Sequence, residues 1–61
     1  MSRSHQILAL LQTGRKTAYE IARALDLTQE QVYTQLVRLE AVGKADCHVL
    51  TEPRRAVWYR T

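Results

Sequence analysis

Apolar residues recur three and four positions apart through the first two thirds of the chain, which is the spacing of amphipathic helices. The pattern predicts a first helix over residues 4–13, capped by Ser2 or Ser4 and ended by Gly14. Its apolar positions are Ile7, Leu8, Leu10 and Leu11. A connection of Gly14, Arg15 and Lys16 follows.

Two further helices are indicated by capping boxes, in which a Thr caps the backbone and an acid or amide three residues later reaches back. Thr17 with Glu20 begins the second helix, and Thr28 with Gln31 begins the third. Apolar positions of the second helix are Ala18, Ile21, Ala22 and Leu25, and those of the third are Val32, Leu36, Leu39 and Val42. Gly43 stands where a helix end favours a residue that tolerates left-handed geometry.

The period changes from helical to alternating after Lys44. Cys47 and Val49 fall on one side of a strand, and Asp46 and His48 fall on the other. A polar turn is predicted over residues 51–55 and a returning strand over 56–60, which is rich in residues that favour strands. The fold class is therefore α+β, with three helices and a C-terminal two-stranded hairpin in a single domain over residues 1–61.

Length and composition restrict the classes of function that this protein can have. Sixty-one residues with 46% hydrophobic and 25% charged residues describe one small globular domain. A core this small leaves little room for a catalytic pocket, so we expect no enzyme. A single Cys excludes an internal disulfide, and no apolar run approaches the ~18 residues of a membrane span. We expect a cytoplasmic protein with no signal peptide.

The chain is basic, with nine Lys and Arg against six Asp and Glu and a net charge of +3. Residues 44–61 hold four of the basic residues and two of the acidic ones, so positive charge is densest in the hairpin. This balance favours a polyanionic partner.

Two helices joined by a short turn, the second one capped at its entry, describe a helix-turn-helix. Small residues at Ala18, Ala22 and Ala24 would let the helices cross closely. Leu25, Leu27 and Val32 would hold that crossing from inside.

Together with Gly43-Lys44 and the strand Arg54-Arg55-Ala56-Val57-Trp58-Tyr59, this pattern resembles the winged helix-turn-helix of small bacterial or phage transcriptional regulators. Within that class the chain is most similar to compact regulators of fimbrial operons. It also resembles small winged-helix proteins of ferrous-iron transport, which carry several wing cysteines where this chain has Cys47 alone. A third class, the winged-helix binders of left-handed DNA, would place Asn at Tyr33 and Tyr at Val37.

The resemblance makes residues 28–42 the recognition helix in a major groove and residues 45–60 a wing on the backbone or minor groove. At ~100° per residue, the side opposite Val32 is free for contacts with base edges. The candidates for base contact are Gln29, Gln31, Tyr33 and Thr34. The candidates for backbone contact are Arg15, Lys16, Thr28, Arg38, Lys44, Arg54 and Arg55.

Other chemistry-bearing residues have structural interpretations. Strand alternation separates Cys47 from His48, and two ligands do not close a zinc site, so we expect no metal and no cofactor. Trp58 either covers the helices as part of the core or stacks on DNA; the first is favoured.

The function favoured by the sequence is sequence-specific binding of double-stranded DNA by a small transcriptional regulator. The alternative is a protein-interaction module that keeps the fold but reads no DNA, with Glu30, Tyr33 and Val37 as its interface. A larger regulatory protein or a second copy of the chain is a candidate partner. No membrane and no small-molecule ligand are expected.

Overall fold

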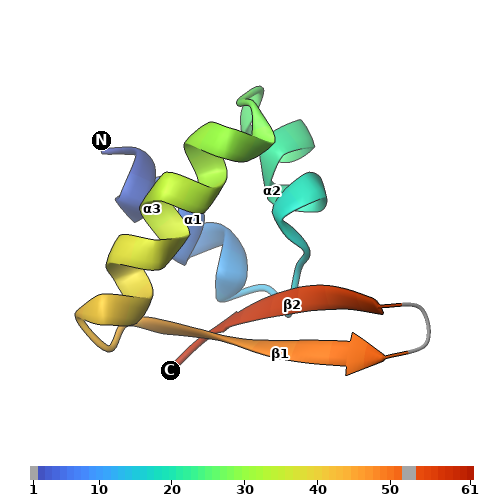
Figure 1. The fold of residues 1–61 in the computed structure, drawn as a ribbon. Coiled ribbons are helices and arrows are strands. Elements are labelled where there is room, and N and C mark those ends of the chain that lie inside the picture. Colours follow the sequence, from blue (N-terminus) through green and yellow to red (C-terminus); the bar gives the residue numbers. More distant parts are fainter. Residues whose placement is uncertain (1, 52–53) are drawn as a thin grey trace.

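The computed structural model describes residues 2–51 and 54–61, except for the side chain of Arg54. Three helices, α1 (Arg3–Leu11), α2 (Ala18–Leu25) and α3 (Gln29–Ala41), precede two strands, β1 (Ala45–Thr51) and β2 (Arg54–Arg60). The strands form one antiparallel hairpin, which lies across the open side of the three-helix bundle (Figure 1). The predicted fold class is confirmed. None of the described helices combines the length and the hydropathy that a membrane span needs.

Each helix begins at the predicted cap. The Ser2 side chain accepts a hydrogen bond from the His5 backbone at α1. At α2, Thr17 N–H donates to Glu20 Oε1 at 3.0 Å, and Glu20 N–H donates to Thr17 Oγ1 at 3.1 Å. Thr28 and Gln31 make the same pair of bonds at α3. Because a cap satisfies backbone donors that the helix leaves free, these boxes fix where each helix starts.

The helix ends differ slightly from the prediction. The first helix ends at Leu11, two residues before the predicted end, because Thr13 N–H and Gly14 N–H bond to carbonyls three residues back and tighten the chain into a turn. The third helix ends at Ala41, and Gly43 adopts the expected positive φ of 76°. Gly43 N–H donates to Glu40 O, and Lys44 N–H donates to Leu39 O. These two bonds form a Schellman motif that turns the chain into β1.

Between α2 and α3 the chain turns on a left-handed residue that is not glycine. Asp26 has φ 56° and ψ 47°, and Leu27 N–H donates to Ala22 O at 2.9 Å. An exposed acid here also sits at the negative end of the α2 dipole, which is unfavourable.

Asp26→Gly should therefore stabilise the protein. Glycine adopts positive φ without the steric cost of a Cβ, which we expect to contribute about 0.5–1 kcal/mol. For a domain of this size that gain raises Tm by about 2–8 °C. Thermal denaturation followed by circular dichroism measures the shift. Asp26→Ala keeps a Cβ and serves as the control; equal Tm values for the two variants would contradict the explanation.

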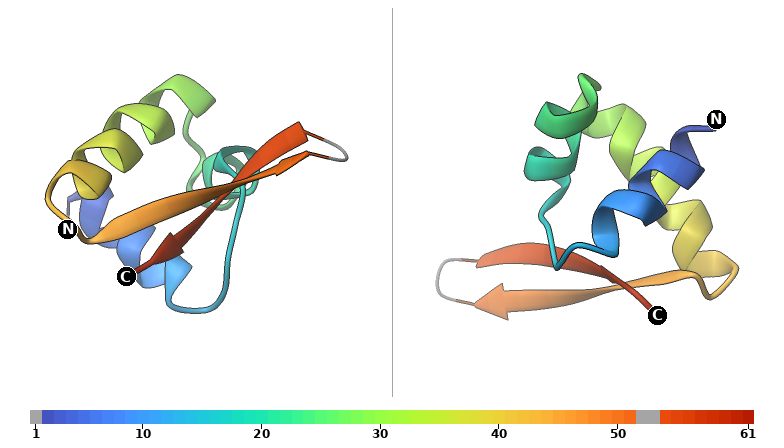
Figure 2. Two further views of the ribbon diagram at one scale, coloured as in Figure 1. Left: turned by 60° about the horizontal axis from the view of Figure 1, so that its bottom comes forward. Right: turned by 180° about the vertical axis from the view of Figure 1, so that it is seen from behind.

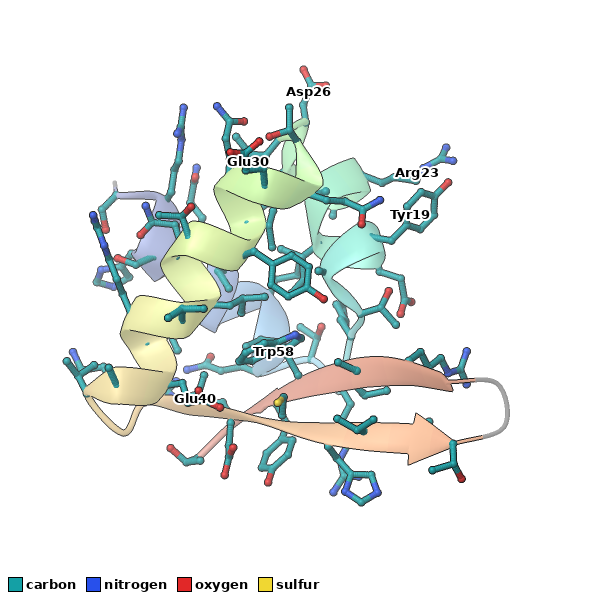
Figure 3. The ribbon with its side chains drawn as sticks, viewed as in Figure 1. Tyr19, Arg23, Asp26, Glu30, Glu40 and Trp58 are labelled. Carbon is teal, nitrogen blue, oxygen red and sulfur yellow. The ribbon has the colours of Figure 1, made fainter. Side chains whose placement is uncertain are left out.

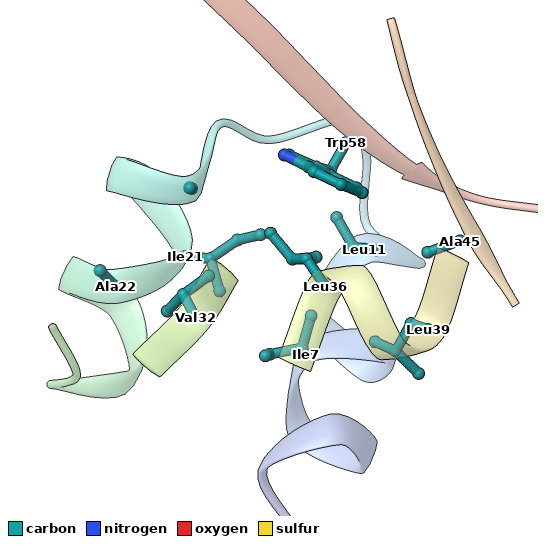
Figure 4. Packing of buried hydrophobic residues seen from close by; sticks show 10 residues of the cluster. Ile7, Leu11, Ile21, Ala22, Val32, Leu36, Leu39, Ala45 and Trp58 are labelled. Carbon is teal, nitrogen blue, oxygen red and sulfur yellow. The ribbon is translucent and has the colours of Figure 1, made fainter. Parts of the chain in front are cut away.

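The core lies where the three helices meet the hairpin (Figure 4). Ten buried apolar residues form it: Ile7, Leu11, Ala18, Ile21, Ala22, Val32, Leu36, Leu39, Ala45 and Trp58. Leu25 and Leu27 pack against this cluster as predicted. Two predictions are wrong: Ala24 is exposed and does not line the helix crossing, and Val42 is 67% exposed because it follows the last turn of α3.

The hairpin pairs in a register that places Cys47 opposite Trp58 and His48 opposite Val57. Cross-strand partners share a face, so Cys47 and Trp58 face the helices, while His48 lies on the other side. The strands are longer than predicted, since Thr51 and Arg54 already pair across the end of the hairpin. The rest of the predicted polar turn, residues 52 and 53, lies outside the described residues.

The connection between α1 and α2 pairs with β2 through an isolated antiparallel bridge. Lys16 N–H donates to Trp58 O at 3.0 Å, and Trp58 N–H donates to Lys16 O at 2.8 Å. This bridge fixes β2 to the helical part of the chain, so the wing is anchored at its middle. Beyond that point the hairpin projects past α2 (Figure 1).

Candidate nucleic-acid interface

The outer side of α3 is free of core contacts. Val32, Leu36 and Leu39 point inward and are buried. The residues on the opposite side are exposed: Glu30, Thr34, Val37, Arg38 and Ala41. This helix is therefore held by one side and presents the other to whatever binds, as a recognition helix must.

The four predicted base-contact residues differ in which polar atoms they leave free to bond a DNA base. Gln29 is exposed in the first turn of α3. Thr34 is exposed, and its hydroxyl donates to Glu30 O at 3.0 Å, which leaves the oxygen lone pairs and the methyl group facing outward. The half-buried Gln31 side chain accepts from Thr28 N–H, which uses one of the two acceptor positions of its oxygen and leaves its NH₂ group free.

Tyr33 is the fourth, and it lies partly over the core. Its ring is 43% exposed and packs edge-on against Trp58, with ring centroids 6.3 Å apart and planes 82° apart. Trp58 itself is only 4% exposed, so it belongs to the core, as the sequence favoured. Its buried indole N–H has no hydrogen-bond partner among the described residues.

Basic side chains gather where the α1–α2 connection, the start of α2 and the hairpin meet. The pKa of the Glu20 carboxyl is lowered, first by its hydrogen bonds with Thr17 and then by the nearby charges of Lys16 and Arg55. Lys16 Nζ donates to Thr13 Oγ1 at 2.9 Å, and the Arg15 guanidinium lies 5.0 Å from the centre of the Tyr59 ring. Three of the predicted backbone contacts, Arg15, Lys16 and Arg55, thus lie near the start of α2, whereas Thr28 lies beyond the other end of α2, where it caps α3.

The remaining predicted backbone contacts lie elsewhere. Arg38 is exposed on α3, and Lys44 follows the end of that helix. The side chain of Arg54 lies outside the described residues. A further pair that the sequence did not single out, Tyr19 and Arg23, projects from α2, with Arg23 Nη1 donating to the Tyr19 hydroxyl at 3.0 Å (Figure 3).

An acidic cluster lies at the other end of α3, beside the hairpin. Donor atoms of Glu40, Asp46 and Cys47 all lie within 4.8 Å of one another. Burial, followed by the charges of Glu40 and Asp46, raises the pKa of the Cys47 thiol. The thiol, 3.9 Å from Glu40 Oε2, therefore acts as a donor to that carboxylate. The sequence placed Cys47 correctly but missed this cluster, because it depends on where α3 crosses β1.

Cys47 should react slowly with thiol reagents. Alkylation needs the thiolate, and a raised pKa lowers the thiolate fraction at every pH below that pKa. Glu40→Gln removes the carboxylate that faces the sulfur, so we expect faster alkylation by iodoacetamide and a pH–rate profile displaced to lower pH. Glu30→Gln, which changes an exposed acid at the opposite end of α3, is the control. Equal rates for wild type and Glu40→Gln would contradict this assignment.

No protein-family model matches this sequence, and no curated protein sequence matches it. Solved structures do match the fold. The reduced form of the transcriptional regulator YodB from B. subtilis is 23% identical, with a TM-score of 0.87 over 95% of this chain and 59% of its own. A double mutant of Lactococcus lactis ZitR in apo form is 24% identical, with a TM-score of 0.89 over 100% of this chain and 47% of its own.

At this level of identity the likeness shows the fold. The chain is a winged helix-turn-helix, in agreement with the resemblance that the sequence predicted. It spans about half the length of the two proteins that it matches.

Proposed function

We propose that this protein binds double-stranded DNA as part of transcriptional regulation, with α3 in the major groove and the hairpin as a wing. The observation that carries the proposal is the geometry of α3: one side is fixed by three buried residues and the other is exposed and mainly polar. YodB, whose fold this chain shares, is a transcriptional regulator.

The charges favour one way of docking. Glu40 and Asp46 would repel phosphates at the C-terminal end of α3, whereas Lys16 and Arg55 would attract them near the start of α2. We infer that the DNA backbone passes along the N-terminal ends of α2 and α3, where free backbone N–H groups also favour anions. Arg15, Thr28 and Arg54 would join this contact, and Arg38 and Lys44 would reach the backbone on the other side of the groove.

Within α3, Gln29 and Thr34 are the residues best placed to read bases. Gln can bond bidentately to adenine, and Thr can bond a base or contact a thymine methyl group. Gln31 would contribute mainly through its NH₂ group, since its oxygen is held by the cap. Tyr33 would contact the DNA with the exposed part of a ring whose other part rests on Trp58.

Gln29→Ala with Thr34→Ala should reduce sequence discrimination while leaving non-specific binding almost intact. A lost base contact costs about 1–3 kcal/mol of discrimination, which is about five- to 150-fold. The test selects preferred sites from a random duplex library and then compares affinities for the selected site and for random DNA. Gln6→Ala, which removes an exposed Gln from α1, is the matched control. An unchanged ratio in the double variant would place recognition on another surface.

A second candidate function is supported by the apolar residues near α3. Val37 is 56% exposed, Val49 is 52% exposed and Tyr33 is 43% exposed. Tyr33 and Val37 lie on the side of α3 that also carries Glu40, and Val49 shares a hairpin face with Cys47. An apolar surface beside an acidic cluster suits a protein partner with apolar and basic side chains better than it suits phosphate. A larger regulatory protein or a second copy of the chain would be that partner.

A further inference from the structure

A cavity of about 350 Å³ opens at the end of the molecule away from the start of α3. Its lining residues come from α1, the end of α3 and the end of β2. Figure 2 shows the C-terminal end of β2 beside the turn that joins α3 to β1. Leu8 and Leu39 supply apolar walls, and His5, Lys44 and Arg60 supply basic ones. No acidic side chain is among the described residues that line it.

The residues that line the cavity come from separate parts of the sequence, and the fold brings them together. The pairing of Ala45 with Arg60 brings the end of β2 beside Lys44, just after α3. Thr61 fastens the junction, because its hydroxyl donates to Gly43 O at 2.6 Å and its N–H donates to Lys44 O at 3.3 Å. His5 comes from α1, which packs against α3 through Leu39 and its neighbours in the core.

We propose that this cavity binds a small organic carboxylate with an aliphatic body. The Arg60 guanidinium and the Lys44 ammonium offer charge-assisted donors to a carboxylate, and Leu8 and Leu39 offer an apolar surface to its chain. The volume falls at the lower end of the ~300–1,000 Å³ range of small-molecule sites. A bare inorganic anion would leave the leucine side unfilled, and a neutral lipid would make no use of the two positive charges.

This site is separate from the proposed DNA contacts at the start of α3. Thirteen residues of helix separate the two, which is about 20 Å at 1.5 Å per residue. Lys44 is the exception, since it lines the cavity and is also a proposed backbone contact. Binding of the carboxylate is therefore testable without DNA, and its outcome is independent of whether the protein reads DNA.

The experiment titrates the protein with hexanoate, hexanamide and acetate, with binding followed by calorimetry and by amide chemical shifts. We expect saturable binding of hexanoate, with the largest shifts at the lining residues. Hexanamide lacks the charge and acetate lacks the apolar body, so each should bind at least about tenfold more weakly. Equal binding of hexanoate and hexanamide, or no saturation with hexanoate, would overturn the proposal.

A pair of matched charge variants localises the site. Lys44→Gln with Arg60→Gln should weaken hexanoate binding at least about tenfold. Arg23→Gln with Arg38→Gln removes the same charge from residues outside the cavity and should leave affinity within about twofold. An equal loss in both double variants would mean that only net charge matters, which overturns the site. If Lys44→Gln with Arg60→Gln fails to fold, the comparison of the three ligands still decides.

Discussion

Trp58→Ala is expected to abolish cooperative folding near room temperature or to lower Tm by at least about 15 °C. Trp58 is 4% exposed, packs against Tyr33 of α3, and exchanges two backbone hydrogen bonds with Lys16. Removing a buried aromatic ring costs about 3–5 kcal/mol. A 61-residue domain has a free energy of unfolding of only about 3–9 kcal/mol. The free energy lost in Trp58→Ala is thus comparable to the protein's whole free energy of unfolding.

Trp58→Phe separates packing from the indole N–H. Phe keeps most of the buried area and removes a donor that has no partner among the described residues, so it should cost less than half as much as Ala. Urea and thermal denaturation measured by circular dichroism give both values. A Trp58→Ala protein with wild-type Tm would show that the hairpin does not belong to the core.

Val37→Glu is expected to weaken DNA binding at low salt by at least about tenfold, or about 1.4 kcal/mol, while changing stability by no more than about 0.5 kcal/mol. Val37 is 56% exposed, so the substitution costs little in the core. In a major groove the new carboxylate would meet phosphates from the side of α3 that carries Glu30, and it would add to the negative charge of Glu40 three residues away. The loss should therefore be electrostatic and decrease as salt is added.

Val42→Glu is the matched control for this variant. It makes the same substitution at a residue that is 67% exposed and lies beyond the last turn of α3, so DNA affinity should change by less than about threefold. If the apolar surface around Val37 binds a protein instead, Val37→Glu would lose that partner and keep its DNA affinity. Unfolding of Val37→Glu would contradict the exposed position assigned to this side chain.

The sequence predicted the helices and their caps well because those signals are local. Thr17 with Glu20 and Thr28 with Gln31 act within four residues of each other, and Gly43 is required by a single backbone conformation. The predictions that were wrong concern exposure at element ends. Val42 fits the apolar period of α3 but follows its last turn, and Ala24 is small but lies on the outer side of α2.

The candidate site could be predicted only in part, since its chemistry depends on contacts between elements. The oxygen of Gln31 serves the helix cap, which a residue type cannot reveal. The acidic cluster of Glu40, Asp46 and Cys47, and the cavity between Lys44, Arg60 and His5, each require the crossing of α1, α3 and the hairpin. Position along the helix showed which side of α3 is exposed; it did not show which flank the wing covers.

Titration of a random-sequence duplex at several salt concentrations between about 50 and 200 mM tests the central claim most directly. Each phosphate neutralised by Lys or Arg contributes about −0.9 to the slope of log K against log salt. With the six proposed basic side chains on the backbone, we expect saturable binding and a slope of about −5. Absence of binding at the lowest salt, or a slope near zero, would contradict DNA binding and favour the protein-interaction function.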